Sequence, residues 1–156
     1  GCEIVLACDL VVASTKAKFG VPEVKRSLVP AAGGVSRLPR KVPLAVAMEM
    51  ILTGEPISAQ RAYEVGLVNV LCEEGREKCL AAALALAERI AVNAPLAVRE
   101  AKACVDELAF TGVGDDVSFK RMNSAIGKLA RTPDFMEGPR AFIEKRAPKW
   151  TGKSKL

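Results

Sequence analysis

The spacing of apolar residues changes part-way along this chain, and that change limits the folds the chain can adopt. Up to Thr53 the apolar stretches are short and are interrupted by Gly and Pro, most densely in Pro30–Gly34. From Ser58 onwards most apolar residues recur at intervals of three and four, which indicates helices. The sequence therefore predicts a mixed α/β part over residues 1–56 and a helical part over residues 57–156.

The first part is expected to contain short elements. The pattern predicts a short helix over residues 3–8, strands over 10–13 and 18–20, and a further helix over 35–40. After Pro43, apolar residues at helical spacing predict a helix over 44–53, which ends at a glycine in the usual C-terminal capping position. These elements are too short to form a core unless they pack against one another.

The second part is expected to be dominated by helices. Ser58 is a favourable N-cap for a helix over 59–65, and residues 67–71 have a β-like pattern. Beyond them the pattern predicts helices over 80–90, 95–108, 119–129 and 133–146, followed by a loose basic tail from residue 147. One apolar seam steps 3, 4, 3 and suits a partner helix: it consists of Phe119, Met122, Ile126 and Leu129.

Composition excludes several classes of site. The chain has 156 residues, a net charge of +5, five cysteines and no histidine. Without histidine there is no Ser-His-Asp or Cys-His catalysis and no usual zinc site within these residues. No basic run is interleaved with aromatic residues, so nucleic acid is not an expected partner, and no apolar run is long enough for a membrane span. An odd number of cysteines without a CxxC pair favours reduced thiols and a cytoplasmic location.

Glu3 and Glu23 are the carboxylates with the greatest chemical interest, although local pattern alone gives each an ordinary role. An acidic residue in the first turn of a helix is favoured by the helix dipole, which accounts for Glu3. Glu23 follows a proline and has the pattern of a solvated turn residue. Neither residue indicates catalysis by itself.

Several segments taken together carry more information than either glutamate. They are Gly1–Asp9, Phe19–Glu23, Pro30–Gly34 and the pair Arg37-Leu38. In combination they resemble the crotonase (enoyl-CoA hydratase/isomerase) superfamily. The resemblance implies an α/β fold, in which the C-terminal part of a crotonase-like ββα spiral core is followed by an all-helical oligomerisation region.

The start of the chain falls within one of these motifs. The run in the superfamily is Gly-Gly-Gly-Cys-Glu-Leu, and only its last glycine is matched, by Gly1. The resemblance therefore implies that the chain is the C-terminal part of a longer enzyme. The missing N-terminal half would then supply both backbone N–H groups of the oxyanion hole, and these residues alone are expected to be inactive.

The resemblance also implies a reaction and roles for particular residues. The reaction is addition of water to a 2-enoyl-CoA thioester, giving a 3-hydroxyacyl-CoA, with one water held between the catalytic residues Glu3 and Glu23. The backbone N–H of Ala31 is expected to contact that water, although many hydratases have glycine there, and Ser27 also stands where glycine is usual. Phe142 and Lys145 are expected to lie near the coenzyme A nucleotide, often across a subunit boundary.

Other properties follow from the same resemblance. Coenzyme A is part of the substrate, so no separate cofactor or metal is expected, and the assembly is expected to be a homotrimer or hexamer. Two alternatives remain open at this point: double-bond isomerisation on the same fold, and a non-catalytic assembly module. Isomerases of the superfamily tend to rely on one carboxylate, so the presence of both Glu3 and Glu23 favours hydration. Residues preceding Gly1 would distinguish an enzyme from an assembly module.

Overall fold

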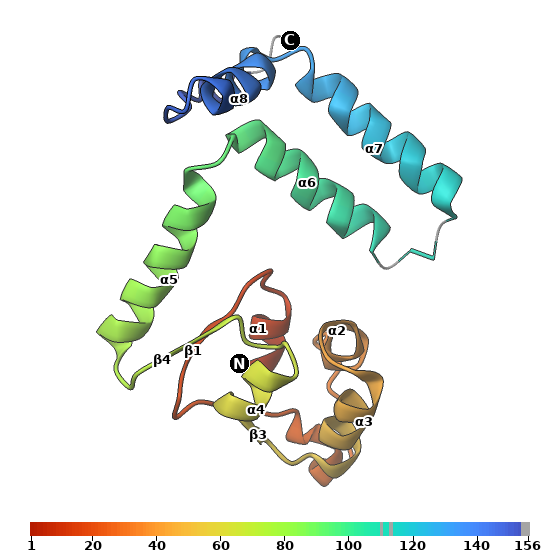
Figure 1. The fold of residues 1–156 in the computed structure, drawn as a ribbon. Coiled ribbons are helices and arrows are strands. Elements are labelled where there is room, and N and C mark those ends of the chain that lie inside the picture. The colour runs from red at the N-terminus through yellow and green to blue at the C-terminus, as the bar shows by residue number, and fades with distance from the viewer. Residues whose placement is uncertain (110, 113, 154–156) are drawn as a thin grey trace. The chain divides into compact units, whose positions relative to one another are not determined.

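The structure is a computed structural model that describes residues 1–109, 111–112 and 114–153 (Figure 1). The chain forms two compact units, Gly1–Leu86 and Ala87–Leu156.

The first unit contains short helices and strands in alternation. Helix α5 (Arg76–Ala91) leads from it into the second unit. The preceding elements are α1 (Cys2–Leu6), β1 (Val12–Ser14), β2 (Lys18–Phe19), the 3-10 helix η1 (Pro22–Arg26), α2 (Gly34–Lys41), α3 (Leu44–Thr53), β3 (Ile57–Ser58), α4 (Ala59–Glu64) and β4 (Val70–Cys72).

Two small sheets join distant parts of this unit. Strand β1 pairs in parallel with β4, with Val12 opposite Val70, and β2 pairs antiparallel with β3, with Phe19 opposite Ile57. This pairing draws β3 and β4 back onto the early strands. The compact unit therefore extends to Leu86, beyond the expected boundary at residues 56 and 57, and the region after residue 57 includes strands as well as helices.

The core of the first unit is mainly aliphatic. Leu6, Leu38 and Met50 are each at most 1% exposed, and they come from α1, α2 and α3, which pack in sequence. Phe19 is the one aromatic side chain among the buried core residues that the structure describes. Burial of a Leu or Met side chain contributes about 1.5–3 kcal/mol. The packing of α1 against α2 is what brings residues of these two helices into a common site.

The predicted N-cap at Ser58 is confirmed. Its Oγ accepts a hydrogen bond from the N–H of Arg61 at 3.1 Å and begins helix α4. The predicted strand over residues 10–13 instead begins at Val12, because the backbone N–H of Val11 donates to the Asn69 side chain at 2.8 Å. That side-chain contact replaces a ladder hydrogen bond at the start of the strand.

The second unit contains α6 (Pro95–Leu108), α7 (Asp115–Leu129) and α8 (Pro133–Ile143). Helices α6 and α7 lie side by side (Figure 1). Arg121 on α7 forms ion pairs with Glu100 at 3.5 Å and with Glu107 at 2.5 Å. The pairing of these two helices therefore combines side-chain packing with interhelical charge pairs.

The prediction of a loose tail from residue 147 is wrong for residues 149–152. Asp134, which is 5% exposed, accepts hydrogen bonds from the N–H groups of Thr151 at 2.8 Å and Gly152 at 2.9 Å. The N–H of Lys149 donates to Glu137 at 2.7 Å, and the Trp150 indole donates to the Val92 carbonyl at 2.8 Å. Carboxylates of α8 thus hold the tail against the unit.

The last helix is also shorter than predicted. It ends at Ile143 instead of residue 146, because Lys145 adopts a left-handed backbone with φ 51°. The N–H of Arg146 then donates to the carbonyl of Ala141 at 3.0 Å, which satisfies a carbonyl at the helix end.

No single helix among the described residues is both long and apolar enough to cross a membrane; only the bent pair α5 and α6, taken together, meets that test by length and composition. The same residues hold no group of three or more metal-ligating side chains. All five cysteines are free thiols.

Candidate active site

Helix α1 positions the first catalytic candidate. Glu3 lies in its first turn, and the helix is anchored by Leu6, which is 1% exposed. The half-buried Glu3 carboxylate accepts a hydrogen bond through Oε1 from the backbone N–H of Gly34 at 2.9 Å. Gly34 is the first residue of α2, where backbone N–H groups lack helical partners and favour an anion. The carboxylate therefore caps the neighbouring helix.

Gly34, whose N–H binds the Glu3 carboxylate at the start of α2, has no room for a larger residue. A Cβ added to Gly34 would lie 2.6 Å from Cβ of Pro30 and 3.1 Å from Oε1 of Glu3. The preceding Gly33 has φ 116°, and a Cβ there would lie 1.9 Å from a guanidinium nitrogen of Arg37. The absence of a side chain at these two glycines thus makes room for Glu3 and Arg37, a role that the local sequence pattern does not indicate.

Arg37 holds the glycine-containing loop from its other side. Its Nη1 donates to the carbonyl of Ala32 at 3.1 Å, and its backbone N–H donates to the carbonyl of Gly33 at 2.8 Å. Glu3 and Arg37 thus fix consecutive residues in the second half of the loop, Glu3 at Gly34 and Arg37 at Ala32 and Gly33. The hydrogen bond between Glu3 and Gly34 joins residues far apart in the sequence, and the local sequence pattern does not predict it.

The 3-10 helix η1 positions the second catalytic candidate. Glu23 lies in its first turn, after Pro22 and the buried Val21. The turn ends at Ser27, whose φ of 58° is a left-handed conformation that favours glycine. Ser27 stands where glycine is usual in the superfamily. Its position requires a positive φ angle, which glycine adopts more easily than serine.

The Glu23 side chain has an unsatisfied oxygen. Its Oε2 is buried and accepts no hydrogen bond from any residue that the structure describes. Leaving a buried polar group without a partner costs about 1–3 kcal/mol, and more when the group is charged. A bound water, an ion, a ligand or a donor outside the described residues would satisfy such an oxygen.

Cys2 directly precedes Glu3 in α1 and is half-buried. Burial raises the pKa of Cys2, and the negative charges of Glu3 and Glu23 act in the same direction. The two carboxylates themselves differ in their partners: Glu3 is held by a backbone donor, whereas Glu23 has a buried oxygen without a partner among the described residues.

The other predicted site residues fall in two places. Ala31 is exposed in the turn that precedes Gly34, within the first unit. Phe142 and Lys145 belong to the second unit, where Phe142 is 85% exposed and Lys145 follows the end of α8. The structure thus groups Glu3, Glu23 and Ala31 within one unit, and the substrate-binding roles of Ala31, Phe142 and Lys145 stay predictions.

Comparison with known proteins decides the family. The family model described as enoyl-CoA hydratase/isomerase matches residues 1–153. This chain belongs to the enoyl-CoA hydratase/isomerase family. The enoyl-CoA hydratase of Mycobacterium tuberculosis H37Rv has a similar structure, with 47% identity and a TM-score of 0.88 over 95% of this chain and 57% of that one. The fold is accordingly that of the crotonase superfamily.

Curated relatives agree with this assignment. Enoyl-CoA hydratase domain-containing protein 2, mitochondrial, of Mus musculus is 41% identical over 98% of this chain and 52% of its own length. The 2,3-dehydroadipyl-CoA hydratase of Escherichia coli (strain K12) is 38% identical over 98% of this chain and 58% of its own length. The chain thus spans between half and three fifths of the lengths of these relatives.

Proposed function

We propose that this chain carries the proton-transfer residues of an enzyme that adds water to a 2-enoyl-CoA thioester and forms a 3-hydroxyacyl-CoA. The observation that carries the proposal is the buried Oε2 of Glu23, which has no partner among the described residues and belongs to the same unit as the Glu3 carboxylate. A water bound between the two carboxylates would satisfy this oxygen. The relatives named as hydratases support hydration over isomerisation as the reaction.

The two carboxylates would act as a general acid–base pair. One accepts a proton from the water while the water oxygen bonds to the β-carbon, and the α-carbon receives a proton from the other carboxyl group. Transfer of a proton between the two carboxyl groups then restores their starting protonation states. Because a close pair of carboxylates titrates as a unit, the acid and base roles belong to Glu3 and Glu23 together.

The structure gives the pair two different environments. The Gly34 N–H fixes one oxygen of Glu3, which restricts the carboxylate to one orientation. Glu23 lies on a short 3-10 helix whose first residue is a proline, and its free oxygen is shielded from bulk solvent. Holding the reacting groups in place before the reaction lowers the entropic part of the barrier.

Negative charge on the thioester oxygen needs hydrogen-bond donors as the enolate forms. We propose that these donors come from a part of the protein that precedes Gly1, as the resemblance implies. The larger size of the relatives supports this arrangement. We also propose that Phe142 and Lys145 contact the coenzyme A nucleotide.

A trimer or hexamer is the assembly that we propose for this enzyme. The seam residues Phe119, Met122 and Ile126 are 61%, 38% and 55% exposed, while Ala125 on the same helix is 7% exposed. Helix α7 thus buries the small side chain of Ala125 within its unit, whereas the larger apolar side chains of the seam are exposed to solvent. Exposed apolar side chains that cluster in this way are typical of protein interfaces.

The proposed reaction is tested by assaying the natural protein that carries this chain with two substrates. Crotonyl-CoA reports hydration through loss of its conjugated double bond, and a 3-enoyl-CoA reports isomerisation through gain of one. We expect turnover of crotonyl-CoA to exceed turnover of the 3-enoyl-CoA by at least about 10-fold, a transition-state difference of ~1.4 kcal/mol. The reverse preference, or no turnover of crotonyl-CoA, would contradict the proposal.

A further inference from the structure

Two cavities open beside each other in the second unit. One has a volume of about 250 Å³ and the other about 190 Å³. Three residues line both of them: Leu96 at the start of α6, Leu129 at the end of α7, and Thr132 before α8. The two cavities are therefore neighbours with these side chains as a common wall.

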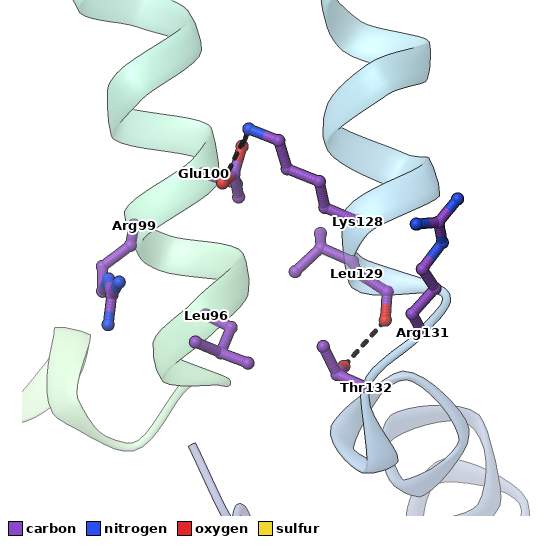
Figure 2. Close-up of a pocket in the computed structure, with 7 residues that line it drawn as sticks. All are labelled: Leu96, Arg99, Glu100, Lys128, Leu129, Arg131 and Thr132. Atoms are coloured by element: carbon purple, nitrogen blue, oxygen red, sulfur yellow. Dashed lines mark hydrogen bonds and ion pairs between the residues drawn. The ribbon is translucent and has the colours of Figure 1, made fainter. Parts of the chain in front are cut away.

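The larger cavity has a basic rim. Three cationic residues, Arg99, Lys128 and Arg131, line it together with a single carboxylate, Glu100. Figure 2 shows Lys128 and Glu100 meeting across the opening between α6 and α7, with Arg99 on the α6 side and Arg131 on the α7 side.

The pairing of Lys128 does not neutralise this rim. Nζ of Lys128 lies 3.4 Å from both carboxylate oxygens of Glu100, and the lysine side chain is 59% exposed. Because the lysine end of this pair is exposed to solvent, a competing anion can replace Glu100 there. Neither Arg99 nor Arg131 forms an ion pair with the described part of the chain. The rim is therefore available to an anionic group.

The smaller cavity is apolar. Apart from the shared residues, its lining comes from Ala94, Ala97, Phe135, Gly138, Trp150 and the carboxylate of Asp134. That carboxylate already accepts hydrogen bonds on both oxygens, from Thr151 and Gly152. Both oxygens of Asp134 thus already have hydrogen-bond partners within the protein. The rest of the lining is mainly apolar, so the cavity suits a hydrocarbon group.

The size of the apolar cavity sets the size of that group. An apolar cavity of about 150 Å³ binds benzene, which has six carbons. At about 190 Å³, the cavity beside Trp150 has room for a hydrocarbon group of similar or slightly larger size. A basic rim and an apolar cavity of this volume are complementary to a carboxylate with a medium-length aliphatic chain.

We propose that the second unit binds a medium-chain fatty carboxylate, with its head at the rim of Lys128 and Arg131 and its chain in the cavity lined by Ala97 and Trp150. This site goes beyond the proposed hydration and uses none of the residues assigned to it. Charge attracts the head to the rim over roughly 8–10 Å at moderate salt. Burial of the chain contributes roughly 0.8 kcal/mol per CH₂ group.

Octanoate is the probe for this site, and Trp150 is the reporter. Trp150 is the single tryptophan of this sequence and is held in place by its hydrogen bond to the Val92 carbonyl. In the natural protein, subtracting the emission of a Trp150→Phe variant isolates this reporter. We expect octanoate to change the Trp150 emission saturably with a Kd of about 1 mM or tighter. Butyrate lacks most of the chain and 1-octanol lacks the charge, so each should bind at least about 10-fold more weakly.

Separate variants test which residues bind the carboxylate head of octanoate and which bind its aliphatic chain. Lys128→Gln with Arg131→Gln should weaken octanoate binding by about 10-fold or more, since charge-assisted hydrogen bonds contribute ~1.5–3 kcal/mol. The matched double variant Lys16→Gln with Arg76→Gln removes the same charge from exposed positions in the first unit and should change the Kd by less than about 2-fold.

The chain cavity has its own variant. Ala97→Leu should fill the apolar cavity and abolish octanoate binding while leaving the fold intact, as judged by circular dichroism. The proposal is overturned if octanoate gives no saturable change, if 1-octanol binds equally well, or if the matched double variant weakens binding as much as the rim variant. These readouts measure binding and do not depend on hydratase activity.

Discussion

Replacing Glu3 or Glu23 by Gln is expected to reduce turnover of crotonyl-CoA by ~10²–10⁴-fold in the natural protein, the usual contribution of a general acid–base group. Glutamine has the shape of glutamate but neither accepts nor gives up the catalytic proton. Its amide oxygen can still accept the Gly34 N–H hydrogen bond at position 3, so the local structure should persist. The effect should therefore appear in kcat, with a much smaller change in KM.

Glu49→Gln is the matched control for these variants. Glu49 is exposed on α3 in the same unit, and its substitution makes the same change of charge and shape. We expect its kinetics to equal those of the unaltered protein. Turnover of either Glu3→Gln or Glu23→Gln that also equals this control would remove that glutamate from the proton-transfer step.

The second large effect is expected on stability, at Asp134. In Asp134→Asn one acceptor oxygen becomes an amide nitrogen, which then faces either the Thr151 donors or the Gly152 N–H. A buried donor opposite another donor leaves both unsatisfied, and we expect the free energy of unfolding to fall by ~2–4 kcal/mol. Urea unfolding followed by Trp150 emission measures this loss and also reports release of the tail.

Acidification should loosen the same tail. Asp134 is buried, and its hydrogen bonds with the N–H groups of Thr151 and Gly152 lower its pKa despite that burial. Hydrogen bonds from Arg146 and the Lys149 N–H lower the pKa of Glu137 from 4.5 to about 2. Groups with a lowered folded-state pKa stabilise the fold above their unfolded pKa, and this contribution is lost as the pH falls through the folded pKa. Tail anchoring should thus weaken as the pH drops from about 4.5 towards 2.

Asp106→Asn is the control for the stability experiment. Asp106 forms an exposed ion pair with Lys102 on one face of α6 at 2.7 Å. Such a pair contributes ~0.3–0.5 kcal/mol, so this variant should unfold almost like the unaltered protein. Equal stability of Asp134→Asn and Asp106→Asn would mean that the tail contacts contribute little to the fold.

Local signals in the sequence were sufficient for several elements. Ser58 was predicted as an N-cap because its side chain bonds three residues along the chain, a contact decided within one turn. The helix beginning at Pro95 was predicted because proline is favoured in a first turn. These features depend on neighbours in sequence and can therefore be derived without knowing the fold.

Features that depend on distant residues could not be predicted in the same way. The hydrogen bond from Gly34 to Glu3 joins α1 to α2, and the anchoring of Thr151 by Asp134 joins the tail to α8. The basic composition after residue 147 indicated a solvated tail, because nothing in the local pattern identifies a buried carboxylate as its partner. The pairing of Glu3 with Glu23 was inferred from a resemblance, and local patterns gave each an ordinary role.

The central claim is that Glu3 and Glu23 share one water over the double bond of an enoyl thioester. The most direct test is a crystal structure of the natural protein with a bound 2-enoyl-CoA analogue. We predict a water whose oxygen lies roughly 2.6–3.2 Å from a carboxylate oxygen of each glutamate, with Oε2 of Glu23 as one of the contacts. The claim would be contradicted if Oε2 of Glu23 accepted a hydrogen bond from a protein donor and the thioester lay away from both carboxylates.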